Sequence, residues 1–164
     1  MATKLNSMRL LEKHGVPYEV VEYPDTIRDA EEIAERLGVP AHMVYKTLVV
    51  QSAAGGKPFL VMLAANRRLD LKAMAKAAGQ KKVQMAAHKD AERETGLKVG
   101  GISALALMHK NWAVYIDRPA TQLEHILISA GQRGMQLRVP VAALIQIVGA
   151  RVAEVGSDSG GDEE

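Results

Sequence analysis

The spacing of apolar residues predicts several amphipathic helices, each bounded by residues that favour helix ends. The predicted helices cover residues 5–11, 30–37, 70–78 and 141–148, and residues 89–95 are predicted as a helical turn that Gly96 ends. Asp29 or Thr26 can cap the second helix and Asp70 the third, because their side-chain oxygens can accept hydrogen bonds from free main-chain N–H groups. Gly38 and Gly79 stand where these two helices should end.

Runs of β-branched and apolar residues predict the strands between these helices. The predicted strands cover residues 18–23, 45–51, 59–65, 83–86, 113–117, 124–129, 135–139 and 151–155. Gly55 and Gly56 separate the second strand from the third and indicate a hairpin. Since helices and strands mix without strict alternation, we expect one α/β domain of the α+β type with a largely antiparallel or mixed sheet.

The chain of 164 residues is long enough for one domain with a substantial core, predicted over residues 1–155. Residues 156–164 are rich in Gly, Ser and acidic residues and are predicted to form a disordered tail. The tail carries four of the acidic residues, so the rest of the chain has about +6 of a total formal charge of +2. Such a moderately basic body is compatible with phosphate binding but does not require it.

Composition excludes several classes of site. Without cysteine the chain has no disulfide, no thiolate zinc site and no cysteine nucleophile. Aromatic residues make up only 4%, which argues against a platform that stacks nucleic-acid bases. No apolar run reaches the roughly 18 residues of a membrane span, and the N-terminus lacks a leader pattern, so we expect a cytoplasmic protein.

Lys46 is unusual because it lies at the start of the apolar strand predicted at 45–51. A lysine there must reach a sheet edge, pair with a carboxylate or face a cleft. It is either a solvated edge residue or a functional point charge for a phosphate or a carbonyl oxygen.

Two glycine-containing segments are further candidates. The segment from Gly100 to Ser103 could present main-chain N–H groups to an anion, or it could simply form a tight bend. The segment from Ser129 to Gly134 combines a hydroxyl and a guanidinium with a turn, or it could simply be a hairpin turn with a surface arginine. The chain has no P-loop, no catalytic triad and no metal-ligand spacing among its histidines, so we expect neither metal nor cofactor.

Together these segments resemble the YbaK/prolyl-tRNA synthetase-associated domain family of trans-editing deacylases, from about residue 10 to about residue 155. The matching strings are Val44-Tyr45-Lys46-Thr47-Leu48, Leu69-Asp70-Leu71-Lys72, Lys81-Lys82-Val83, Thr95-Gly96, Val99-Gly100-Gly101-Ile102-Ser103 and Ser129 through Gly134. The resemblance implies a single domain with a mixed, barrel-like curved sheet flanked by helices. It also implies cleavage of the ester that joins a wrong amino acid to tRNA, most typically Cys-tRNA(Pro), with prolyl-tRNA synthetase as a candidate partner.

The resemblance places the family's site residues on this sequence. The implied catalytic residues are Lys46, Gly101 and Ser129, and the implied substrate-binding residues are Tyr45, Thr47, Gly100, Ile102, Ser103, Gly131 and Arg133. For a cysteinyl ester the substrate thiol would attack its own carbonyl, whereas for other amino acids a positioned water would attack.

The sequence departs from the cysteinyl branch at three positions. Ala104 replaces a proline, Ala130 replaces a glycine and Gln136 replaces an aspartate. The amino acid removed therefore stays open among cysteine, alanine, serine and threonine. Two further interpretations also stay open: a module that binds tRNA or a synthetase without turnover, and a lysine Schiff-base enzyme.

Overall fold

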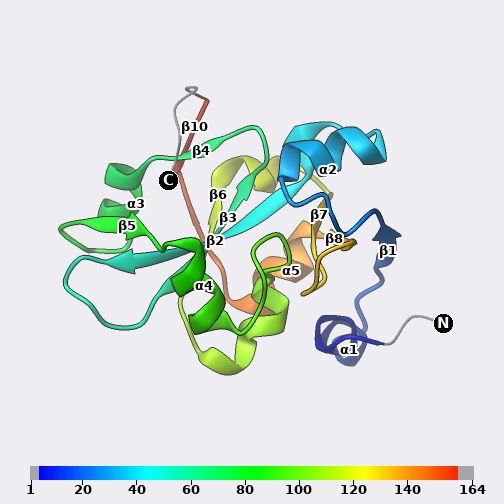
Figure 1. Cartoon of the computed structure of the whole chain (residues 1–164), viewed down its shortest axis with the longest axis horizontal. Helices are drawn as coiled ribbons and strands as arrows, with labels where there is room; N and C mark the ends of the chain where they lie inside the picture. The colour runs from blue at the N-terminus through cyan, green and yellow to red at the C-terminus, as the bar shows by residue number, and fades with distance from the viewer. Residues whose placement is uncertain (1–3, 159–164) are drawn as a thin grey trace.

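The largest sheet runs through the centre of residues 4–158, the part of the chain that a computed structural model describes (Figure 1). Its strands are β5 (Val83–Met85), β2 (Tyr45–Ser52), β3 (Phe59–Ala64), β6 (Val114–Asp117) and β9 (Arg151–Ala153), in that spatial order. The pairs β5–β2 and β2–β3 are antiparallel, whereas β3–β6 and β6–β9 are parallel. The predicted mixed sheet is therefore confirmed, as is the hairpin between β2 and β3.

Two smaller sheets accompany it. One is antiparallel, with the order β1 (Glu19–Glu22), β8 (Met135–Pro140) and β7 (His125–Ser129). The other pairs β4 (Arg68–Leu69) with β10 (Gly156–Ser157). A parallel bridge between Val44 and Leu127 connects the start of β2 to β7.

The predicted α/β fold with a mixed sheet is confirmed, and the strands of the described residues form no closed barrel. The reason lies along the edge of β2 that faces away from β3. The C-terminal part of this edge pairs with β5, at Val50 to Ser52, whereas its N-terminal end meets β7 through Val44. The strands β5 and β7 therefore diverge along β2, and the two sheets separate between them.

The central strand β3 explains the two-sided core. All six of its residues are buried, and they alternate between two apolar clusters. Leu60 and Met62 belong to the larger cluster, whereas Val61 and Leu63 belong to a smaller one that includes Met74 of the helix α3 (Leu71–Ala77). Because both faces of β3 are covered, its sequence is a continuous apolar run.

The helices cover these sheets. They are α1 (Asn6–Lys13), α2 (Ala30–Leu37), α3 (Leu71–Ala77), α4 (His88–Thr95) and α5 (Val141–Val148), with shorter 3₁₀ helices η1 (Ala41–Met43), η2 (Ala104–Lys110) and η3 (Arg118–Gln122). The predicted caps are confirmed: the Asp29 carboxylate accepts from the Glu32 N–H at 3.2 Å, and that of Asp70 from the Ala73 N–H at 3.1 Å. No helix within residues 4–158 is long and apolar enough to cross a membrane.

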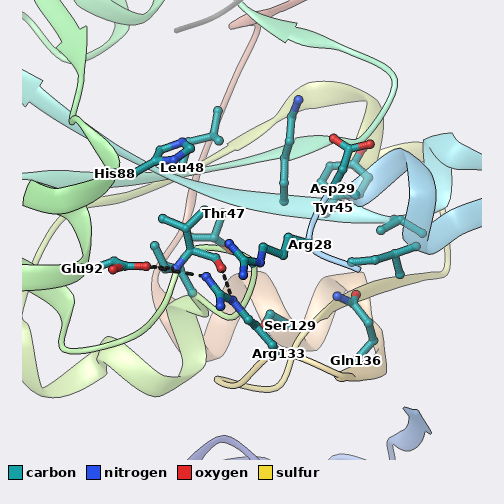
Figure 2. A pocket seen from close by; sticks show the side chains of 17 residues that line it. Arg28, Asp29, Tyr45, Thr47, Leu48, His88, Glu92, Ser129, Arg133 and Gln136 are labelled. Atoms are coloured by element: carbon teal, nitrogen blue, oxygen red, sulfur yellow. Dashed lines mark hydrogen bonds and ion pairs between the residues drawn. The ribbon is translucent and has the colours of Figure 1, made fainter. Parts of the chain in front are cut away.

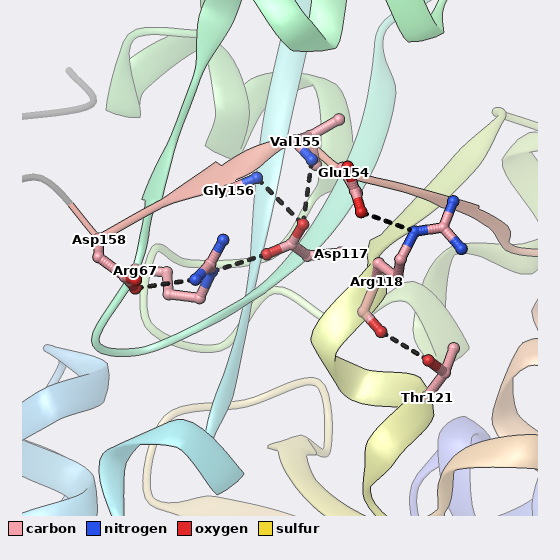
Figure 3. Close-up of polar contacts among 8 residues, drawn as sticks. All are labelled: Arg67, Asp117, Arg118, Thr121, Glu154, Val155, Gly156 and Asp158. Atoms are coloured by element: carbon pink, nitrogen blue, oxygen red, sulfur yellow. Dashed lines mark hydrogen bonds and ion pairs between the residues drawn. The ribbon is translucent and has the colours of Figure 1, made fainter.

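The end of the described chain is fastened by what we call the C-terminal clamp, made of Arg67, Asp117, Val155, Gly156 and Asp158 (Figure 3). Asp117 is 1% exposed, and its Oδ1 accepts from the N–H groups of Val155 and Gly156, each at 3.0 Å. Its Oδ2 accepts from Arg67 Nε at 2.9 Å, and the same guanidinium reaches Asp158 at 2.8 Å.

The clamp includes the first residues of the predicted tail. Gly156 and Ser157 form β10, because Asp117 holds the Gly156 N–H and β4 pairs with both residues. Residues 159–164 of the predicted tail lie outside the described residues.

Candidate functional site

A cavity of about 490 Å³ opens where β5 and β7 diverge along β2 (Figure 2). This volume is within the range of small-molecule sites in proteins. Its wall comes from α2, β2, α4, the loop before η2 and the β7–β8 pair. The lining residues are Arg28, Asp29, Ala30, Ile33, Val44, Tyr45, Lys46, Thr47, Leu48, His88, Glu92, Val99, Gly100, Ile102, Ser129, Arg133 and Gln136.

The open edge of β2 contributes main-chain groups to this cavity. The Val44 carbonyl accepts from the Ala65 N–H on the β3 side, whereas the Val49 carbonyl accepts from the Ala86 N–H on the β5 side. Because successive residues of a strand direct their peptide groups to opposite edges, Thr47 directs its N–H and C=O to the same edge as Val49. Thr47 thus presents a donor and an acceptor toward the cavity.

Lys46 is half-buried in the cavity wall. Its neighbours along β2 are Tyr45, which is buried, and Thr47, which is half-buried. Lys46 thus lines a cleft, which is one of the locations that the sequence left open for it. Tyr45 forms part of the same wall and lies close to the C-terminal clamp. Burial, reinforced by the negative charge of Asp117 and opposed by Arg67, raises the pKa of Tyr45 to about 12.

Ser129 and Gln136 form a polar pair on another wall. They are direct partners in the register of β7 and β8, so their side chains lie on the same face of the pair. Ser129 is 7% exposed, and its Oγ accepts from the Gly131 N–H at 3.1 Å, which leaves the hydroxyl proton free to donate. Gln136 is 3% exposed, and its Oε1 has no hydrogen-bond partner within the described chain. A buried acceptor of this kind at a cavity wall is suited to a ligand donor.

The loop that contains Gly100 is held by two charged side chains (Figure 2). Arg133 Nε donates to the Val99 carbonyl at 2.7 Å, and Glu92 Oε2 accepts from the Val99 N–H at 2.8 Å. The guanidinium and the carboxylate also pair with each other at 3.8 Å. Both peptide groups of Val99 are therefore fixed before any ligand binds.

Gly101 allows this loop to pack against the β7–β8 turn. A Cβ at Gly101 would lie 2.8 Å from the main-chain nitrogen of Arg133 and from the carbonyl carbon of Gln132, closer than real Cβ atoms approach. The Gly101 N–H itself donates to the Lys98 carbonyl at 2.7 Å. Gly101 thus has a packing role, and its N–H is occupied within the protein.

Comparison with known proteins gives the family of this fold and cavity. The aminoacyl-tRNA editing domain matches residues 24–147, which include every residue that lines the cavity. The chain belongs to the aminoacyl-tRNA editing domain family. It is an enzyme of the aminoacyl-tRNA deacylase family, for which mischarged tRNA is the implied substrate.

Individual relatives agree with this assignment. A protein of Enterococcus faecalis named as a candidate Cys-tRNA(Pro)/Cys-tRNA(Cys) deacylase, EbsC, is 38% identical over 154 residues that cover 93% of each chain. The crystal structure of a hypothetical protein, APE2540, is similar with a TM-score of 0.84 at 26% identity, covering 93% of this chain and 99% of that one. A structure described as a candidate trans-editing enzyme for prolyl-tRNA synthetase shares the fold, with a TM-score of 0.80 at 23% identity, over 95% of this chain and 99% of that one.

The editing-domain cavity contains seven of the ten residues that the sequence placed in the site. These are Tyr45, Lys46, Thr47, Gly100, Ile102, Ser129 and Arg133. Gly101, Ser103 and Gly131 are not among the lining residues. Ser103 is fully buried and its Oγ has no partner among residues 4–158, whereas the Gly131 N–H donates to Ser129 and so orients that hydroxyl.

Sequence reasoning missed Arg28, His88 and Glu92, which also line the cavity. Asp29, another lining residue, was predicted only as a helix cap. A signal existed for His88 and Glu92, because residues four apart share a face of one helix. Arg28 gave no local signal, since it precedes α2 and reaches the cavity only through the tertiary fold.

Proposed function

We propose that this chain is a trans-editing deacylase that removes cysteine from mischarged tRNA(Pro). The observation that carries the proposal is that Lys46, Ser129 and the Gly100 loop line one cavity of small-molecule size. The relative named as a candidate Cys-tRNA(Pro)/Cys-tRNA(Cys) deacylase supports the choice of cysteine, since it matches over nearly the whole chain. The residue set suits an ester that is already activated, because positioning and charge stabilisation can suffice for its cleavage.

In the proposed site the Lys46 ammonium and the Ser129 hydroxyl supply positive charge and a hydrogen-bond donor to the ester carbonyl as it develops negative charge. The peptide group of Thr47 and the loop at Gly100 hold the terminal adenosine. Gln136 accepts from the α-ammonium group of the amino acid through its free Oε1. Each group acts by binding and orientation, without a covalent enzyme intermediate.

For a cysteinyl ester, the substrate thiol attacks its own carbonyl carbon. A carbon–sulfur bond forms, the bond from that carbon to the ribose oxygen breaks, and the thiol proton ends on the ribose hydroxyl. The products are a cyclic thiolactone and free tRNA. For an amino acid without a thiol, a water molecule held at the same carbonyl must act as the nucleophile.

The proposal is tested by offering the purified protein, in catalytic amounts, a panel of tRNA(Pro) charged with cysteine, alanine, serine, threonine or proline. We expect cysteinyl-tRNA(Pro) to be deacylated fastest and prolyl-tRNA(Pro) to stay intact. Faster loss of alanine, serine or threonine would reassign the substrate. Binding of tRNA without turnover of any member would replace the proposal with a non-catalytic tRNA-binding or synthetase-binding module.

A second arm of the panel separates the two chemical routes. Cysteinyl-tRNA(Pro) with a methylated sulfur cannot cyclise by loss of a thiol proton, so its deacylation should fall to the rate of the alanyl ester. Equal rates for the cysteinyl and the S-methylated substrate would show that water attacks in both cases.

We also propose that prolyl-tRNA synthetase contributes to tRNA selection. The formal net charge of the chain is only +2, and phosphate neutralisation supplies much of the affinity of proteins for nucleic acids. Adding the synthetase should lower the KM for cysteinyl-tRNA(Pro) without changing kcat. An unchanged KM would mean that this chain selects its tRNA alone.

A further inference from the structure

Two arginines lie on either side of the Gly100–Gly101 segment at the cavity. Arg28 crosses over Gly100, since a Cβ on that glycine would lie 3.1 Å from the Arg28 Cβ and 3.5 Å from its Cγ. The main-chain nitrogen of Arg133 packs against Gly101, and its Nε holds the Val99 carbonyl. Figure 2 shows both side chains extending into the same part of the cavity.

The two arginines differ in the partners that they have within the described chain. Asp29 caps α2 through the Glu32 N–H, and Glu92 accepts from the Val99 N–H while it lies 3.8 Å from Arg133. Arg28 has no hydrogen bond or ion pair within residues 4–158. An anion bound beside both side chains would give Arg28 a partner and would add a second one to Arg133.

Gly100 is what allows this arrangement. Its φ of +92° belongs to the region that favours glycine, and the missing side chain leaves room for the stem of Arg28. Arg133 is already fixed by Val99 and Glu92, so part of the entropy loss that a free arginine suffers on binding has occurred before the ligand arrives. One arginine is thus preorganised, and the other is free to close on a ligand.

We infer that Arg28 and Arg133 form a phosphate subsite in the cavity. Guanidinium groups bind phosphate oxygens through paired, charge-assisted hydrogen bonds. This inference rests on the proposed function. In a tRNA deacylase, the bound phosphate would be the one on the 5′ side of the terminal adenosine of tRNA. The subsite binds the tRNA end in the cavity that Lys46 and Ser129 also line.

The first test uses adenosine 5′-monophosphate and adenosine as probes, titrated into the purified full chain by calorimetry or NMR. The wild type should prefer the phosphorylated probe by about tenfold, a typical strength for hydrogen bonds between charged groups. Arg28→Gln should abolish this preference and Arg28→Lys should retain part of it. Arg36→Gln is the matched control, because Arg36 is exposed on α2 outside the cavity, and it should bind as the wild type does.

The second test measures turnover of cysteinyl esters of the same two probes. Arg28→Gln should raise the KM of the phosphorylated ester about tenfold, leave its kcat unchanged and leave the unphosphorylated ester unaffected. Equal binding of both probes by the wild type, or an unchanged preference in Arg28→Gln, would overturn the subsite. A preference that depends on Arg28 in a protein that deacylates nothing would keep the subsite and reject the proposed function.

Discussion

The C-terminal clamp and the cavity are both built around partly or fully buried polar groups, yet they differ in how these groups are satisfied. In the clamp, both oxygens of Asp117 have partners, from two main-chain N–H groups and a guanidinium. In the cavity, the buried Gln136 Oε1 has no partner within the described chain. A buried polar group costs free energy unless it is paired, so the unpaired groups are the ones that a ligand can complete.

Tyr45 lies between these two regions. It lines the cavity, and its pKa is raised by burial and by the charge of Asp117 in the clamp. The paired groups of the clamp stabilise the fold, whereas the unpaired acceptor in the cavity lowers stability and is available to a ligand. Substitutions in the two regions should therefore change different quantities.

Asp117→Ala should have the largest effect on stability. It leaves two main-chain N–H groups and Arg67 without their carboxylate, and breaking a buried ion pair typically costs about 3–5 kcal/mol of the free energy of unfolding. Asp158→Ala removes the other partner of the same arginine, but Asp158 is 84% exposed, so about 0.5 kcal/mol is expected. Urea unfolding measures both values. Similar losses of unfolding free energy in the two variants would contradict the role of the buried Asp117 carboxylate as the main stabilising group of the clamp.

Lys46→Ala should have the largest effect on activity. Removing one group that stabilises the developing oxyanion typically lowers the rate by about 10²–10³. The free energy of unfolding should change by less than about 1 kcal/mol, since Lys46 is half-buried at a cavity wall. Single-turnover deacylation of cysteinyl-tRNA(Pro) measures the rate, with Lys57→Ala in the exposed hairpin loop as control. An undiminished rate would remove Lys46 from the site.

Gln136→Met should change stability and activity in opposite directions. It removes an unpaired buried acceptor at similar volume, so the free energy of unfolding should rise by about 1 kcal/mol. Deacylation should slow through a higher KM, because the α-ammonium group loses an acceptor. Gln84→Met, on the exposed face of β5, should change neither quantity. A variant that is less stable and fully active would make Gln136 a structural residue.

Tyr45→Phe should have the smallest effect, visible only at alkaline pH. The pKa of Tyr45 is raised from 10.0 to about 12 in the folded protein, so between these values the unfolded chain loses a proton that the folded chain keeps. Stability is therefore fully present below pH 10.0 and falls as the pH rises toward 12. The phenylalanine variant should show a shallower fall in urea midpoint. Part of the decrease in stability with rising pH should remain in this variant, because a hydrogen bond to Glu12 raises the pKa of Tyr18 to about 12 as well.

The sequence by itself determined the local features of this protein. The side chains of Asp29 and Asp70 cap the helices at the predicted places, and Gly55 and Gly56 form the predicted hairpin turn. These features depend on residues only a few positions apart, so spacing alone reveals them. The position of Lys46 in a cleft was among the predicted alternatives. A lysine in an apolar strand can keep its charge solvated or paired in only a few locations.

Only the tertiary structure decided which residues meet. Ser129 and Gln136 are neighbours through strand register, and Arg28 reaches the cavity because Gly100 lies under its stem. Gly101 packs against Gln132 and Arg133, which are distant in sequence, and its implied catalytic role stays a prediction. Likewise the cavity exists because β5 and β7 diverge along β2, and the clamp exists because Asp117 meets the end of the chain. Such contacts follow from how strands pair and pack across the whole domain, a property that local spacing does not encode.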